Sequence, residues 1–276
     1  MKKLNSDFIC RALFLLFLIA ISLVVILPYI WMLSNSFKST KETLMDAAHI
    51  FPKAPTLNGY KRVLFESPFF MWLGNSMMVT ITNTLAILFT SSLIGYVFSR
   101  YEFWNKKLLF TMMLSTMMVP AQATIIPTFI LINAVGLFNS PWALIIPSVF
   151  SVFGIYLCKE FIDEIPKELL ESAGIDGAGD WQIFFKIVLP QIRPAIGALG
   201  IFTFLEHWND YLRPLIYLNS SEKMTLPLAI SFFSTQHSTD LSATMAVSAL
   251  IMIPVTIVFL LFQRQFVKGI SMTGMK

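Results

Sequence analysis

The chain has 276 residues, of which 56% are hydrophobic and only 13% charged, and its mean hydropathy is +0.70. An ordinary soluble domain carries about 25% charged residues, so this composition excludes that class and predicts an integral membrane protein. The formal net charge is +4, but the basic residues are spread between apolar runs instead of forming a patch, which argues against nucleic-acid binding.

Six apolar segments are long enough to cross a bilayer, because a membrane-spanning helix needs about 20 predominantly apolar residues. We expect these spans at roughly residues 12–34, 71–98, 108–132, 141–160, 195–218 and 243–263. The first run is about twice as long as the core of a signal peptide, and no small-residue cleavage site follows it. It is therefore predicted to be a retained membrane anchor.

The orientation follows from the basic residues between the spans. Thirteen of the 20 Lys and Arg residues fall on the side that holds both termini, and this side is predicted to be cytoplasmic. Five of the other seven lie in the first external segment, Ser36 to Phe70, where acidic residues dilute them. Its prolines and Gly59 indicate a short structured cap, and residues 1–70 are expected to form the anchor with this cap.

Prolines also occur inside the predicted spans, where they are expected to kink or unwind the helices. They are Pro28, Pro120, Pro127, Pro147 and Pro254.

The cytoplasmic loop between the fourth and fifth spans, residues 162–193, has the pattern of two short helices. Pro166 is placed for a helix start, residues 167–173 favour a helix, and Gly174 and Gly177 are expected to break it. A glycine at the turn permits close approach of another backbone.

The second helix of this loop is predicted to begin with Asp180 as its N-cap. Its apolar residues recur at helical spacing and form one face, which consists of Trp181, Phe184, Phe185 and Val188. Leu189-Pro190 and Pro194 are expected to end it. Taken alone, the pattern fits an amphipathic hairpin that packs under the membrane bundle.

This loop resembles the cytoplasmic coupling loop of permease subunits in ABC importers. The matching residues are Glu171, Ala173, Gly177, Ile187, Leu189 and Pro190, with Ser172 in place of the usual Ala and Asp176 before the glycine. The resemblance implies that the loop inserts into a cytoplasmic ATPase and moves as a rigid lever.

Further motifs resemble the shorter permease of carbohydrate importers. They are Asn75-Ser76, Gly136-Leu137, Asn139-Ser140, Trp208-Asn209-Asp210, Thr225-Leu226-Pro227, Gln263-Arg264, Phe266-Val267 and Gly269. The resemblance implies an all-α integral membrane fold of the type I importer class: six transmembrane helices with a cytoplasmic helix-turn-helix coupling loop. It makes residues 71–263 the permease domain and 264–276 a cytoplasmic tail, whose sequence departs from the family's.

The fifth span contains charged residues that are costly in a bilayer. Glu206, Asn209, Asp210 and Arg213 share one face if the helix is continuous, so they are candidates to line a water-filled path. Trp208 offers a flat surface of the kind on which sugars stack, and Asn75 is a further candidate. The alternative is that Arg213 simply pairs with an acidic neighbour near the outer interface.

We find no phosphate-binding loop, zinc motif or nucleophile motif, so no catalytic or metal residue is assigned and no cofactor is expected on this chain. The resemblance implies partners: a second homologous permease, two ATPase subunits that hold ATP and Mg²⁺, an external solute-binding protein, a sugar and membrane lipid. It also implies a bacterial inner membrane location.

The predicted function is thus that of a sugar or oligosaccharide permease subunit. Three alternatives are a permease for another solute such as a glycerol phosphate or a polyamine, a membrane-embedded enzyme, and an ion-driven transporter. The last two are disfavoured because the spans lack a catalytic constellation and an internal repeat.

Overall fold

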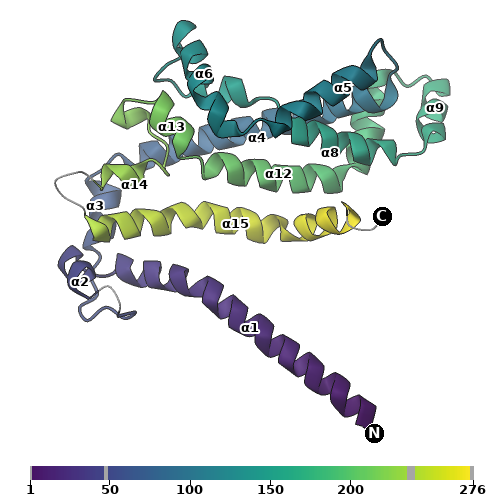
Figure 1. The fold of residues 1–276 in the computed structure, drawn as a ribbon. Helices are drawn as coiled ribbons and strands as arrows, with labels where there is room; N and C mark the ends of the chain where they lie inside the picture. Colours follow the sequence, from purple (N-terminus) through teal and green to yellow (C-terminus); the bar gives the residue numbers. More distant parts are fainter. Residues whose placement is uncertain (1, 47–48, 235–239, 274–276) are drawn as a thin grey trace. The chain divides into compact units, whose positions relative to one another are not determined.

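The computed structural model describes residues 2–46, 49–234 and 240–273, which are largely helical (Figure 1). Three single helices are long and apolar enough to cross a membrane: α1 (Lys2–Ser36), α4 (Phe69–Arg100) and α15 (Leu241–Thr273). The shorter α-helices are α2 (Thr40–Met45), α3 (Asn58–Phe65), α5 (Lys106–Ser115), α6 (Ala121–Ala134), α7 (Trp142–Ile145), α8 (Val152–Asp163), α9 (Lys167–Ile175), α10 (Asp180–Ile183), α11 (Leu189–Gln191), α12 (Arg193–Trp208), α13 (Leu212–Tyr217) and α14 (Ala229–Phe232). Short 3-10 turns are η1 (Thr116–Met118), η2 (Ile146–Ser148) and η4 (Ser221–Lys223), and a π-helical segment, η3, covers Phe184–Val188.

The third and fourth expected spans, residues 108–132 and 141–160, are each divided into two helical parts that meet at an angle, which confirms the kinks expected at Pro120 and Pro147. Residues 106–118 and 121–134 meet at 101°, and residues 142–148 and 152–163 meet at 41°. Two prolines explain these breaks: Pro120 stands directly before α6, and Pro147 lies in η2. Neither residue has a backbone N–H to continue a helix. If each bent pair counts as one span, the described residues contain up to six.

The expected fifth span, residues 195–218, is also not one helix. Its main part, α12, ends at Trp208 after 16 residues, and α13 begins only at Leu212. At its other end, α12 meets residues 180–191 at an angle of 77°. Residues 209–211 are non-helical, and this interruption creates the geometry of the polar cavity described below.

The chain divides into two compact units, and the first contains residues 1–69 and 229–252. The side chains of α1 from Leu13 to Leu33 are mostly exposed, as expected for a helix that meets lipid or another chain. The external segment folds onto the start of α15, where the Asp240 carboxylate accepts a hydrogen bond from Thr40 Oγ1 at 2.6 Å and pairs with Arg62. Residues 229–252 therefore belong to the same compact unit as residues 1–69. The domain bounds expected from the sequence, which place one boundary near residue 70, do not predict this grouping.

Within the external segment, Asp46 pairs with Lys53 Nζ at 2.7 Å. The hydrogen bond from Lys53 lowers the pKa of the Asp46 carboxyl group. Lys38 is fully buried, and its ammonium group donates to the backbone carbonyls of Asp46 and His49. These contacts order a segment that has no long apolar run.

The second unit contains residues 70–228 and 253–276. In it α4, α8 and α12 run side by side (Figure 1). Gly154 of α8 permits this packing, because a Cβ there would lie 2.4 Å from Ser91 Oγ of α4 and 3.0 Å from a methyl group of Leu199 of α12. The main core of this unit joins these three helices to the segment that follows α9; its buried members include Tyr96, Phe161, Ile162, Ile183, Phe184, Val188 and Leu199.

Candidate functional site

The loop at residues 162–193 forms a hairpin that extends α8 and ends the bundle of the second unit (Figure 1). Its first helix, α9, runs through Gly174 to Ile175, so Gly174 does not break the helix as expected. The chain reverses at Gly177, which has φ +84°. Gly177 N–H donates to Gly174 O at 3.0 Å and Ala178 N–H to Ala173 O at 2.9 Å. This pair of bonds is the Schellman arrangement, which uses glycine in the left-handed conformation.

The second half of the hairpin begins one residue earlier than expected. Gly179 occupies the N-cap position and Asp180 lies in the first turn. The helical segment ends at Gln191, directly after Leu189-Pro190, and Pro194 lies in the first turn of the next helix, α12, so the end expected there is confirmed. Pro190 lies in the first turn of α11. Proline is tolerated in a first turn, because the backbone N–H that it lacks would have no hydrogen-bond partner within the helix.

The predicted apolar face of this segment is divided by the π-helical turn η3. Phe184 and Val188 are buried in the core, whereas Trp181 and Phe185 are 60% and 49% exposed. A π-turn has more residues per turn than an α-helix, so it rotates side chains out of the register that α-helical spacing predicts. Buried aromatic packing, with Tyr96 and Phe184 rings 5.5 Å apart, anchors the hairpin.

The structure separates the named hairpin residues into two groups. Glu171, Ser172, Asp176 and Gly177 are exposed, and Ala173, Ile187, Leu189 and Pro190 are partly buried. The exposed group lies at the tip, where Ile175 is 86% exposed. Sequence reasoning did not single out Ile175, although an isoleucine between Gly174 and Asp176 in a polar tip was a usable signal.

Arg100, at the end of α4, holds the base of the hairpin. Its Nη2 donates to the carbonyls of Ile162 and Ile165, the latter at 2.7 Å, and Ser99 Oγ donates to Asp163 Oδ1 at 2.5 Å. Ile162 lies in the last turn of α8, where its carbonyl also accepts the Ile165 N–H at 3.1 Å, and Ile165 lies in the turn that follows. No motif identified this role, because an arginine at a membrane edge is also what the topology rule predicts.

Tyr101 joins the same end of α4 to the second half of the hairpin. Burial raises the pKa of the Tyr101 hydroxyl, and a hydrogen bond with Asp180 raises it further. The rings of Tyr96 and Tyr101 lie edge to face with centroids 5.7 Å apart. The end of α4 therefore contacts both arms of the hairpin.

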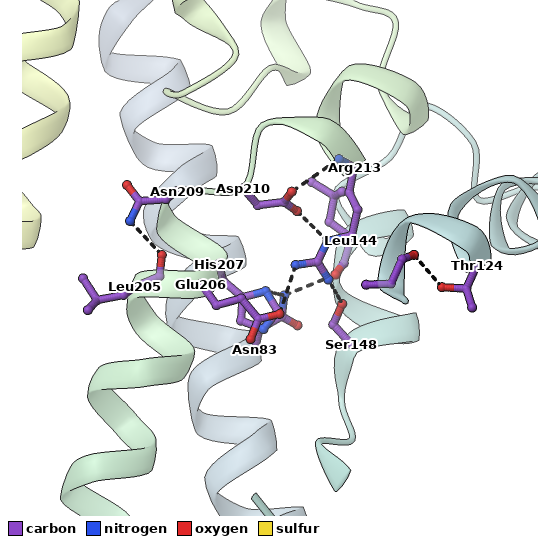
Figure 2. Close-up of polar contacts among 11 residues, drawn as sticks. Asn83, Thr124, Leu144, Ser148, Leu205, Glu206, His207, Asn209, Asp210 and Arg213 are labelled. Carbon is purple, nitrogen blue, oxygen red and sulfur yellow. Dashed lines mark hydrogen bonds and ion pairs between the residues drawn. The ribbon is translucent and has the colours of Figure 1, made fainter. Parts of the chain in front are cut away.

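A second feature is a polar cavity of about 310 Å³ lined by α6, α7, η2, the end of α12, and α13. Arg213 is one of the lining residues, and its guanidinium contacts several of the other labelled side chains (Figure 2). Its Nε is 2.7 Å from Asp210 Oδ2, its Nη2 is 3.7 Å from Glu206 Oε1, and its Nη1 donates to Ser148 Oγ at 2.9 Å. Ser148 was not anticipated, since nothing in the sequence links it to the fifth span.

The expectation that four residues share one helical face is wrong, because α12 ends at Trp208. Glu206, Asp210 and Arg213 still converge, since the chain turns at residues 209–211 and α13 starts in a new direction (Figure 2). Asn209 is not part of this cluster: its Nδ2 donates to Leu205 O at 2.9 Å. The alternative, that Arg213 pairs with acidic neighbours, also holds, because Arg213 pairs with both Asp210 and Glu206. All three residues line the cavity.

Two other candidate path residues are also placed differently from the expectation. Trp208 is fully buried and stacks on Phe204, with centroids 5.7 Å apart and an interplanar angle of 7°, so its face is not open to a sugar. Asn75 donates its amide hydrogens to the carbonyls of Glu222 and Met224 at 2.8 and 3.0 Å. Asn75 therefore ties α4 to η4 and the residue after it, and it is not among the residues that line the cavity.

His207, next to Glu206, is buried against α4. Its Nδ1 is 3.3 Å from Asn83 Nδ2, and Asn83 also donates to Leu144 O at 3.2 Å (Figure 2). These bonds fix the end of α12 relative to α4 and α7. In the part of the chain that the structure describes, no cluster of three or more His, Cys, Asp or Glu residues is arranged to hold a metal.

Apolar helices, a rigid hairpin at one end of the bundle and a polar cavity near the break in α12 together define an integral membrane transport component. The family model of binding-protein-dependent transport system inner membrane components matches residues 87–272. The chain belongs to this family, and the resemblance drawn from the loop motifs is confirmed.

Individual relatives extend this match to nearly the full length of the chain. The arabinooligosaccharides transport system permease protein AraQ of Bacillus subtilis is 33% identical over 265 residues, covering 95% of this chain and 94% of that protein. The polygalacturonan/rhamnogalacturonan transport system permease protein YtcP of the same organism is 32% identical over 275 residues, covering 94% and 96%.

A solved structure is similar in fold. It is the crystal structure of a bacterial ABC transporter involved in the import of the acidic polysaccharide alginate, with a TM-score of 0.84 at 22% identity, covering 95% of this chain and 98% of that chain. The expected fold class, that of the type I importer permease, is confirmed.

Proposed function

We propose that this chain is the permease subunit of an ATP-driven, binding-protein-dependent importer of sugars or oligosaccharides. The observation that carries the proposal is the hairpin closed at Gly177, which presents the exposed side chain of Ile175 at its tip and is braced by Arg100. The carbohydrate substrate is supported by the relatives, which are named for transport of oligo- and polysaccharides.

The chain works with partners in this proposal. A second, homologous permease completes the path, two cytoplasmic ATPase subunits bind ATP and Mg²⁺, and an external binding protein delivers the sugar. ATP binding closes the ATPase pair, and the hairpin carries that motion into α8 and α4. The path then opens outward, and hydrolysis resets it.

A tagged chain purified from its native membrane should bring down the second permease and the ATPase, and isolation of the chain alone under mild detergent would contradict this assembly.

The orientation follows from the positive charges, with both termini and the hairpin in the cytoplasm of a bacterial cell. Ser220→Cys should react in intact cells with a membrane-impermeant thiol reagent, whereas Gly179→Cys should react only after the membrane is opened. The native Cys10 and Cys158 are first replaced by Ser. The reverse labelling pattern would overturn the orientation and the coupling role of the hairpin.

We propose that the cavity around Arg213 borders the sugar path. Asp210 holds Arg213 through its side chain and also accepts the Arg213 backbone N–H at 3.3 Å, whereas Asn209 bonds only within its own helix. Asp210→Ala should therefore lower the initial rate of sugar uptake by at least about ten-fold, since it leaves a partly buried cation without its nearest partner. Asn209→Ala is the matched control and should stay within about two-fold of the parent, because surface substitutions are usually mild. Equal uptake by both variants would remove the cavity from the path.

A further inference from the structure

The family leaves the charge of the sugar open, because its members include transport proteins named for arabinooligosaccharides and for the acidic polymer polygalacturonan. The wall of the polar cavity bears directly on this question. Three of its lining residues carry formal charges, Glu206, Asp210 and Arg213, and the others are uncharged. The formal charge of the wall is therefore −1.

The single cation of this wall is already engaged. The Arg213 guanidinium contacts Asp210 at 2.7 Å, Glu206 at 3.7 Å and Ser148 at 2.9 Å, through all three of its nitrogen atoms. Arginine binds an anionic group best through two parallel N–H bonds from one edge of the guanidinium. An incoming carboxylate or phosphate would have to displace these partners, so Arg213 is not free to recognise an acidic solute.

The carboxylate available to a solute is that of Glu206. Its side chain is 66% exposed, whereas that of Asp210 is 15% exposed. A carboxylate accepts hydrogen bonds and has no donor when ionised. Glu206 therefore suits the hydroxyl groups of a neutral sugar and repels a uronate.

The rest of the polar wall fits hydroxyl groups as well. Gln122, Thr124 and Thr128 of α6 line the cavity together with Ser148 of η2. Thr124 Oγ1 donates to Ala121 O at 2.8 Å, which leaves its oxygen lone pairs as acceptors. Uncharged groups that both donate and accept match the hydroxyls of an uncharged carbohydrate.

We propose that the cavity makes this permease selective for uncharged oligosaccharides and that Glu206 is the residue that rejects acidic ones. The inference rests on the proposed sugar-import function and adds the substrate class to it. The same charge pattern disfavours a glycerol phosphate, which would meet the same exposed carboxylate.

The test uses the complete importer, purified in lipid nanodiscs without its binding protein, so that only the membrane path contributes to selectivity. Galactotriose and trigalacturonate are matched probes, because their rings differ in whether carbon 6 carries a hydroxyl or a carboxylate. Saturation-transfer NMR at pH 7 gives a dissociation constant for each. The parent should bind galactotriose at least about five-fold more tightly than trigalacturonate. This factor corresponds to the repulsion between two like unit charges about 4 Å apart in water. Glu206→Gln should bring the two constants within about two-fold of each other. Glu222→Gln, an exposed change in η4 outside the cavity, should preserve the parental preference.

With the two matched probes, three results would overturn the inference: trigalacturonate binding the parent as tightly as galactotriose, an unchanged preference in Glu206→Gln, or no binding of galactotriose to the parent. None of them decides whether the chain imports sugar, because ATP-dependent uptake by the complete importer with its binding protein tests that separately. If Glu206→Gln does not assemble, Glu206→Ser provides the same loss of charge with a smaller side chain. A cationic amino sugar that binds more tightly than galactotriose would also contradict selectivity for uncharged sugars.

Discussion

Gly177→Leu should abolish most sugar uptake while the protein still reaches the membrane. Gly177 has φ +84°, and the left-handed conformation costs a residue with a Cβ about 1–2 kcal/mol, equivalent to roughly five- to thirty-fold in the population of the native turn. Apart from Gly177 and its two chain neighbours, no atom of the described residues lies within 4 Å of an added Cβ, so the substitution does not disrupt the packing seen around the turn. The loss should come from a displaced hairpin tip and from the bulk presented to the ATPase. Uptake of labelled sugar and co-purification of the ATPase measure both effects.

Two further variants separate these causes. Gly179→Ala is the matched control, because Gly179 has φ −73° and also has open space around its Cα, so uptake should be close to parental. Gly177→Asn tolerates the left-handed conformation and should retain the turn. If Gly177→Leu transports sugar and retains the ATPase as the parent does, the docking role of the hairpin is wrong.

Arg100→Ala should produce a loss of similar size by a different route. Its guanidinium donates to two carbonyls at the base of the hairpin, and a hydrogen bond to a charged group contributes about 1.5–3 kcal/mol. Without it, the hairpin keeps its own turn but is less firmly joined to α4. We expect ATP hydrolysis to continue while sugar uptake falls by at least about ten-fold, so that less sugar moves per ATP consumed.

Lys107→Ala is the control for Arg100, since Lys107 is an exposed basic residue in the next helix on the same side. It should leave the ratio of uptake to hydrolysis unchanged. Arg100→Lys should recover part of the coupling, because an ammonium group can reach one carbonyl but lacks the fork that serves two. A parental ratio in Arg100→Ala would show that the hairpin acts without this brace.

The sequence predicts the apolar spans well because hydrophobic length is a property of a single stretch of chain. Within the described residues, α1, α4 and α15 lie where the first, second and sixth spans were expected. The loop at 162–193 is likewise identified from local signals, above all the glycine that the turn requires. Its π-turn at Phe184 is not predictable from periodicity, which assumes one helical repeat throughout.

The polar cavity shows where sequence reasoning stops. Helical spacing correctly grouped Glu206, Asp210 and Arg213. They do not share a helical face, however, because α12 ends at Trp208 and a new helix, α13, begins at Leu212. The same spacing wrongly included Asn209, and the expectation that Trp208 offers a surface to a sugar is wrong because its ring is fully buried. Ser148 bonds to Arg213 and Arg100 bonds to Ile165, and each partner is 65 residues away in the chain, so only tertiary packing brings these pairs together.

The most direct test of the account is ATP-driven sugar uptake by the complete importer in proteoliposomes, with ATP sealed inside and the binding protein and a labelled neutral oligosaccharide outside. The sugar should accumulate only when this permease, ATP and the binding protein are all present, and Gly177→Leu and Arg100→Ala should each reduce accumulation relative to their controls. Accumulation that persists without ATP, or that is unchanged when this chain is omitted, would contradict the account.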